Sequence, residues 1–115
     1  MVEFRQRVLA LDTNFVKLPA SLMLEYMGPF HSKTRSVLRA IVSHPTTEFD
    51  LGKIARSIGM EFDDLDGPLR GIAARTQHIF GVNAYLIRID GTSASITPET
   101  YATLREFFAA RDVAA

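Results

Sequence analysis

The sequence predicts one α+β domain, mainly helical, with a β-hairpin in its C-terminal third. Apolar residues recur at helical spacing along Lys33–Ser43 and Leu51–Ile58. Residues 85–96 alternate about Asp90-Gly91, a pair that favours a tight hairpin turn. The chain has 115 residues, 47% of them hydrophobic, and no low-complexity run. It is therefore long enough for one small hydrophobic core.

Composition excludes several classes of protein. The chain contains no cysteine, which rules out disulfides, thiolate metal sites and cysteine nucleophiles. It contains no apolar run near the ~20 residues needed to span a bilayer. The first residues, Met1–Leu11, are interrupted by charged side chains and so lack the apolar stretch of a signal peptide. We therefore expect a soluble cytoplasmic protein with no membrane partner.

The N-terminal residues predict a strand and a short buried helix. Phe4–Leu11 alternates loosely, as a strand does, and Asp12-Thr13-Asn14 predicts a turn. Pro19 suits the start of a helix over Ala20–Met27, which Gly28-Pro29 ends. The helix is apolar for its length, so we expect it to be buried in the core or against a second chain. Its apolar side chains are Leu22, Met23, Tyr26 and Met27.

The next helix and strand have clear boundaries. Ser32 is the expected N-cap of Lys33–Ser43, and His44-Pro45 stops this helix. Thr46–Phe49 is short and β-prone, so we expect a small strand beside the later hairpin. The apolar stripe of the helix consists of Val37, Leu38, Ile41 and Val42.

Two further helices have the spacing of a helix-turn-helix. Asp50 caps Leu51–Ile58. A third helix begins near Asp63 or Asp64 and runs to about Phe80 before Gly81. Pro68 would lie in its first turn or just beyond, and the second case would start the helix a few residues later than the acids suggest. Two short helices can cross closely only where a small residue meets the partner, and the sharp turn between them needs a residue that accepts a positive φ. Ala55 is the small residue at the crossing, and Gly59 accepts the positive φ at the turn. The inward residues of the third helix are Leu65, Leu69 and Ile72.

The hairpin has one apolar face. A turn at Asp90-Gly91 pairs Ile89 with Thr92, Ile87 with Ala94, and Tyr85 with Ile96. A turn at Gly91-Thr92 would keep the same faces. The other face shows Arg88, Ser93 and Ser95.

The last helix begins at Thr97-Pro98-Glu99, which combines a cap, a first-turn proline and a carboxylate near the positive end of the helix dipole. We expect the residues after Arg111 to fray. The aromatic stripe of this helix consists of Tyr101, Leu104, Phe107 and Phe108.

The order helix, short strand, helix, helix, hairpin over Ser32–Thr97 resembles the winged helix-turn-helix superfamily. The resemblance rests on the five helix-turn-helix residues above and on the hairpin sequence AYLIRIDGTSASIT. It implies a winged-helix core over residues 31–97, an N-terminal extension over 1–30, and a C-terminal helix and tail over 98–115. Such domains are most often bacterial transcription regulators that insert the third helix in the major groove and lay the wing beside it.

The resemblance implies a set of DNA contacts. Arg70, Arg75 and Gln77 would reach the major groove, with Thr76 and His78 as further donors. Gly67 and Gly71 would allow close approach of DNA, or of a neighbouring helix. Flanking phosphates would be contacted by Lys33 and Arg35, and the wing-side backbone by Arg88.

A protein-binding module without DNA binding is the alternative. The formal net charge is zero, whereas phosphate binders usually carry a basic excess. Asp63, Asp64 and Asp66 stand at the start of the third helix, and helix capping explains them better than metal binding does.

We also expect a homodimer, because a core this small is unsuited to covering both terminal helices. The expected interface residues are Leu22, Tyr26, Tyr101, Leu104, Phe107 and Phe108.

No catalytic or cofactor motif is present. His31, His44 and His78 are far apart in sequence, without the spacing of a metal site. The chain has no glycine-rich phosphate loop and no nucleophile elbow. We expect no metal, no cofactor and no enzymatic activity.

Overall fold

The computed structural model describes residues 14–114, which form an α+β fold that is mainly helical. This confirms the predicted class; the predicted strand Phe4–Leu11 lies outside the described residues. The helices and strands are the 3₁₀ helix η1 (Ala20–Leu22), α2 (Met23–Met27), α3 (Ser32–Ser43), β1 (Glu48–Asp50), α4 (Leu51–Ser57), the 3₁₀ helix η2 (Phe62–Leu65), α5 (Asp66–Phe80), β2 (Arg88–Asp90), β3 (Ser93–Ser95) and α6 (Pro98–Ala114).

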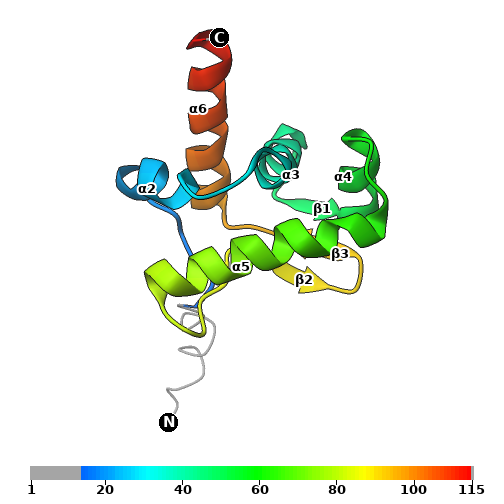
Figure 1. The fold of residues 1–115 in the computed structure, drawn as a ribbon, viewed down its shortest axis with the longest axis horizontal. Coiled ribbons are helices and arrows are strands. Elements are labelled where there is room, and N and C mark those ends of the chain that lie inside the picture. The colour runs from blue at the N-terminus through cyan, green and yellow to red at the C-terminus, as the bar shows by residue number, and fades with distance from the viewer. Residues whose placement is uncertain (1–13, 115) are drawn as a thin grey trace.

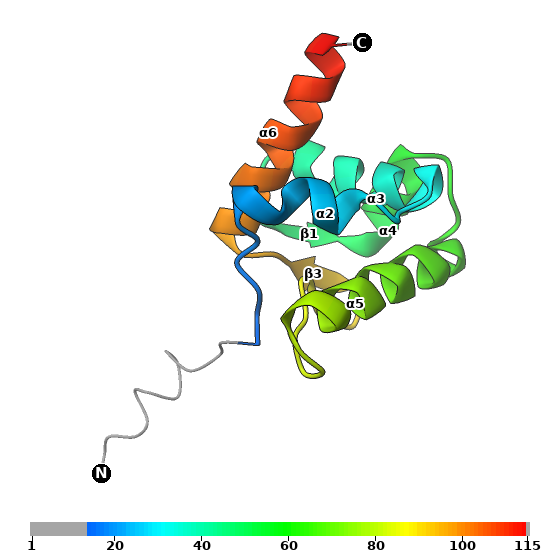
Figure 2. The ribbon, with the colours of Figure 1, turned by 60° about the vertical axis from the view of Figure 1, so that its left-hand side comes forward.

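Helix α3 lies at the centre and packs against α4, α5 and α6. Helix α5 lies beside the β2–β3 hairpin (Figure 1), and the C-terminal half of α6 projects beyond the rest of the fold (Figure 2). One core runs from Val16 to Phe108 and includes residues of every α-helix. Residues 16–27 and the C-terminal helix therefore share the core of residues 31–97. The predicted stripe of α3 is confirmed, since Val37, Leu38, Ile41 and Val42 are all buried.

The three strands form an antiparallel sheet in the order β1-β3-β2. Phe49 and Ile89 both pair with Ala94, on either side of β3. The hairpin register predicted from an Asp90-Gly91 turn is wrong. The turn residues are Gly91 and Thr92, so Ile89 pairs with Ala94 and not with Thr92. Gly91 has a φ of +67° at the first turn position, where hairpin turns require a positive φ, and the described residues hold no positive φ outside glycine.

The predicted pairing of Tyr85 with Ile96 is also wrong. The Tyr85 amide donates to the Asn14 carbonyl at 2.8 Å, and its carbonyl accepts from the Val16 amide at 2.9 Å. The rings of Phe15 and Tyr85 stack with centroids 5.2 Å apart. The segment before α2 therefore takes the place that the other hairpin strand was expected to fill.

Most predicted helix ends are confirmed. The Asp50 carboxylate accepts from the Lys53 amide at 3.0 Å, and the Thr97 hydroxyl accepts from the Thr100 amide at 3.1 Å. Gly59 follows α4 with a φ of +73°. Ser32 is not an N-cap but the first residue of α3. Helix α6 continues to Ala114, past Arg111, where we expected its end to fray.

The predicted third helix is divided in two. A 3₁₀ turn, η2, precedes α5, and the Asp64 carboxylate accepts from the Glu61 amide at 3.3 Å. Pro68 lies in the first turn of α5, where its missing N–H costs no hydrogen bond. Of the predicted inward residues, Leu65 and Ile72 are buried and Leu69 is half-buried.

Two buried threonines fix the start of α6, and their burial has no signal in the sequence. The hydroxyls of Thr97 and Thr100 donate to the Val16 carbonyl at 3.1 and 3.0 Å. The Thr100 hydroxyl also accepts from the Leu18 amide at 3.0 Å. These bonds satisfy backbone groups of an extended segment that would otherwise be buried without partners.

Candidate functional site

Two of the predicted DNA contacts are internal helix caps. The Arg35 guanidinium donates to the carbonyls of Phe30 at 3.2 Å and Met27 at 2.8 Å. The guanidinium of Arg75 donates to the carbonyls of Tyr26 at 3.3 Å and Glu25 at 2.7 Å. The last carbonyls of a helix have no partner inside the helix, so two cations from other helices satisfy the end of α2. The prediction that Arg35 and Arg75 contact DNA is therefore corrected.

Thr76, expected to offer a donor to DNA, is fully buried. Its hydroxyl donates to the Ile72 carbonyl at 2.7 Å and lies 2.9 Å from the Tyr26 hydroxyl. Burial raises the pKa of Tyr26 from 10.0 to about 12, and the hydrogen bond to Thr76 opposes that rise only in part. This pair joins α2 to α5 inside the core.

The other four predicted DNA contacts lie on the surface. Lys33 and Gln77 are exposed. Arg70 forms an ion pair with Asp66 at 2.9 Å, and the two side chains are 80% and 67% exposed. Arg88 lies over the Phe15 ring, 4.6 Å from its centroid, and donates to the Tyr85 hydroxyl at 3.2 Å. On α5, the predicted donors that the structure leaves exposed are therefore Arg70, Gln77 and His78.

The predicted dimer interface is largely buried within one chain. Tyr26 and Leu104 are fully buried and Phe108 is 5% exposed, because α6 packs on α3 and α2. Leu22, Tyr101 and Phe107 are half-buried. The three buried residues cannot contact a second copy, so this part of the prediction is corrected. The single core is large enough to cover the inner sides of both terminal helices.

An apolar hollow lies where α5 approaches the hairpin, and we call it the α5–hairpin groove. Its volume is about 490 Å³. A smaller hollow of about 60 Å³ continues it and shares Leu69 and Ile89 with it. Phe62 and Ile89 are 46% and 48% exposed, and unlike the more exposed Leu24 and Val82 they both line this groove. The groove is lined by Leu51, Phe62, Asp63, Leu65, Asp66, Leu69, Ile89 and Gly91.

The surroundings of this groove are acidic. Asp63 and Asp66 line it, and Glu61 and Asp64 flank them in the same exposed segment. Arg70, bound to Asp66, is the cation that follows in the sequence. A phosphate brought to this face would meet negative charge before it met a donor.

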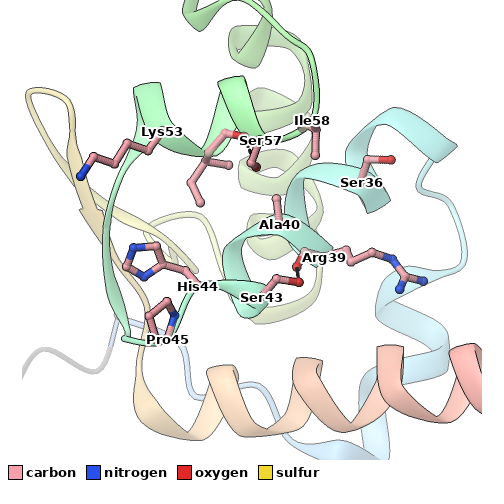
Figure 3. A pocket seen from close by; sticks show the side chains of 10 residues that line it. Ser36, Arg39, Ala40, Ser43, His44, Pro45, Lys53, Ser57 and Ile58 are labelled. Carbon is pink, nitrogen blue, oxygen red and sulfur yellow. Dashed lines mark hydrogen bonds between the residues drawn. The ribbon is translucent and has the colours of Figure 1, made fainter.

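A second hollow separates α3 from α4, and we call it the α3–α4 cleft (Figure 3). Its volume is about 510 Å³. Helix α3 carries Lys33, Arg35 and Arg39, helix α4 carries Lys53 and Arg56, and neither helix contains an acidic residue. The cleft is lined by Ser36, Arg39, Ala40, Ser43, His44, Pro45, Lys53, Ile54, Ser57 and Ile58.

Neither hollow contains a cluster of metal ligands among the described residues. Within residues 14–114, no three His, Asp or Glu side chains are grouped closely enough to hold a metal ion. No helix of that part of the chain is both long and apolar enough to cross a membrane. The acidic segment could be seen in the sequence, whereas the exposure of Phe62 and Ile89 depends on how η2 and the hairpin meet.

Comparisons with protein-family models, with curated proteins and with solved structures find no match to this chain.

Proposed function

We propose that residues 32–97 form a winged-helix domain in which α5 is the recognition helix and the β2–β3 hairpin is the wing. The order of elements supports this proposal, as does the pairing of β1 with the edge of the hairpin at β3. Gly59, at φ +73°, makes the sharp turn between α4 and the following helix.

We propose that this domain binds protein rather than DNA, through the α5–hairpin groove. The observation that carries the proposal is the pair of exposed apolar side chains, Phe62 and Ile89, set around a hollow that Asp63 and Asp66 also line. Exposed apolar surface gains free energy when a partner covers it, whereas bringing phosphate to carboxylates costs free energy. The face that would meet DNA is therefore better suited to a polypeptide.

Charge defines the partner. A segment with one or two bulky apolar residues would fill the hollow beside Leu51 and Leu65, and a flanking Lys or Arg would reach Asp63 or Asp66. We therefore expect the partner to be a basic, apolar peptide segment.

Selection from a random peptide library displayed on phage tests this function. We expect enrichment of peptides that combine apolar and basic residues. Binding of an enriched peptide should weaken about tenfold or more for Phe62→Ser, because a central apolar anchor is lost. Val82→Ser is the matched control, since Val82 is 78% exposed and does not line the groove. No enrichment, or equal loss in both variants, would contradict the proposal.

DNA binding by a regulator is the second candidate, and the order of elements favours it. Arg70, Gln77 and Lys33 are exposed and could still reach DNA. If Arg70 reads a base, Arg70→Ala should cost about 1–3 kcal/mol of binding free energy, and binding should weaken steeply with salt. A mobility-shift series with genomic fragments at low salt tests this. Absence of a shift at micromolar protein would remove the second candidate.

A further inference from the structure

We propose that the α3–α4 cleft binds a small organic anion, with a phosphate or carboxylate group at the end formed by Lys53 and His44 and a compact apolar body beside Ala40 and Ile54. This site is separate from the α5–hairpin groove, and the two share no lining residue.

The size and lining of the cleft suit a small molecule. A volume of about 510 Å³ falls within the range of about 300–1,000 Å³ that is typical of ligand pockets. Ala40, Pro45, Ile54 and Ile58 supply apolar surface from both helices and from the residues that follow α3. An apolar body placed there would be removed from water, which stabilises the bound state.

The charge of the cleft selects an anion. Its lining includes Arg39 and Lys53 and no carboxylate, and α3 and α4 carry no acidic residue at all. The Arg39 guanidinium lies over the Phe108 ring, 4.9 Å from the centroid, so it contributes positive potential from the α6 side. Figure 3 shows Arg39 extending to the side opposite Lys53.

The placement of Lys53 and His44 identifies the end at which the anionic group would lie. His44 Nδ1 lies 3.3 Å from the Thr46 amide nitrogen and 3.2 Å from the Thr46 hydroxyl, so both contacts with Thr46 are made by Nδ1 and neither uses Nε2. Figure 3 shows the His44 ring and Lys53 at the same end of the cleft, where Lys53 supplies a positive charge and three N–H donors.

The serine hydroxyls are less suited to the anionic group. Ser43 and Ser57 donate to the carbonyls of Arg39 at 2.8 Å and Ile54 at 2.7 Å, within their own helices. Their protons are used, so Lys53 and His44 remain the better pair to receive a negative group.

NMR titration of the full chain with benzoate, phenyl phosphate and uncharged benzyl alcohol tests the proposal. At equal ionic strength, we expect benzoate or phenyl phosphate to shift the amide signals of α3 and α4, including Ala40 and Ser57, while benzyl alcohol does so much less. The stronger of the two anions identifies the head group.

Two lysine variants make the test specific. Lys53→Gln should weaken binding about tenfold, the usual effect of losing a charge-assisted hydrogen bond. Lys33→Gln removes a lysine of α3 that does not line the cleft, so it should leave the affinity for the anion unchanged. Equal shifts by benzyl alcohol, equal losses in the two variants, or no shift with either anion at millimolar concentration would overturn the proposal.

Discussion

The two faces beside α4 carry opposite charge although the chain is formally neutral. The α3–α4 side has Lys53 and Arg39 and no acidic residue on its two helices, whereas the α5–hairpin side has Asp63 and Asp66 in its groove. A net charge of zero therefore hides two distinct electrostatic surfaces. This separation bears on the proposed winged-helix domain, because the basic residues of α3 and α4 do not lie on α5, its proposed recognition helix.

The largest effect is expected from a substitution that removes core packing from α4, the helix that borders both faces. Ile54 is 3% exposed, packs in the core and lines the α3–α4 cleft. Ile54→Ala should destabilise the protein by about 2–5 kcal/mol, since it removes buried methyl groups and leaves a cavity. Chemical denaturation monitored by circular dichroism measures this. A loss below about 1 kcal/mol would mean that α4 is not part of the cooperative core.

Alkaline pH should act through the buried contact between Tyr26 of α2 and Thr76 of α5. Folding raises the pKa of Tyr26 from 10.0 to about 12, so the neutral phenol is favoured in the folded state. This contribution is fully present below pH 10 and is lost as the pH rises through 12, a decrease of about 2–3 kcal/mol. Denaturation curves between pH 9 and 12 measure it. Tyr26→Phe should flatten this part of the pH dependence, and an unchanged slope would contradict the assignment.

Charge reversal sharpens the comparison directly. Asp63→Lys with Asp66→Lys should raise low-salt affinity for double-stranded DNA about tenfold or more, because two repelling groups become two phosphate contacts. The same pair should weaken binding of a basic peptide. Fluorescence anisotropy with a labelled duplex measures the first effect. As a control, Glu99→Lys with Glu106→Lys makes the same charge change on α6; an equal gain there would show a net-charge effect only.

The smallest expected effect concerns the surface ion pair within α5. Arg70→Ala removes the contact to Asp66, and both side chains are largely exposed. The free energy of unfolding should fall by less than about 1 kcal/mol. A thermal-melt comparison with Gln77→Ala, another exposed position of α5, measures this. A loss of several kcal/mol would show that Arg70 has a structural role that its exposure does not reveal.

Local signals explain what the sequence predicted correctly. The stripe of α3, the caps at Asp50 and Thr97 and the turn at Gly59 each depend on residues within a few positions. The predicted hairpin register was wrong because an Asp90-Gly91 turn would put Asp90 where a positive φ is needed, and in the structure Gly91 takes that first turn position.

The errors in the candidate site have a different cause. Arg75 binds carbonyls that lie 49 and 50 positions away, and backbone acceptors carry no sequence signal. Likewise, the sequence of the aromatic stripe of α6 does not depend on whether the same chain or a second copy covers it. The sequence alone therefore predicts Leu104 and Phe108 at a dimer interface, whereas in the structure α6 buries both side chains within one chain.

The double cap on α2 makes arginine, not merely positive charge, the requirement at two positions. Arg35 and Arg75 each place two nitrogens on two different carbonyl oxygens, which the planar fork of a guanidinium permits. A lysine at either position has one nitrogen on a flexible stem and would have to hold both carbonyls from a single point. The arginine-to-lysine exchange that is usually harmless on a surface would here loosen the attachment of α2 to both α3 and α5.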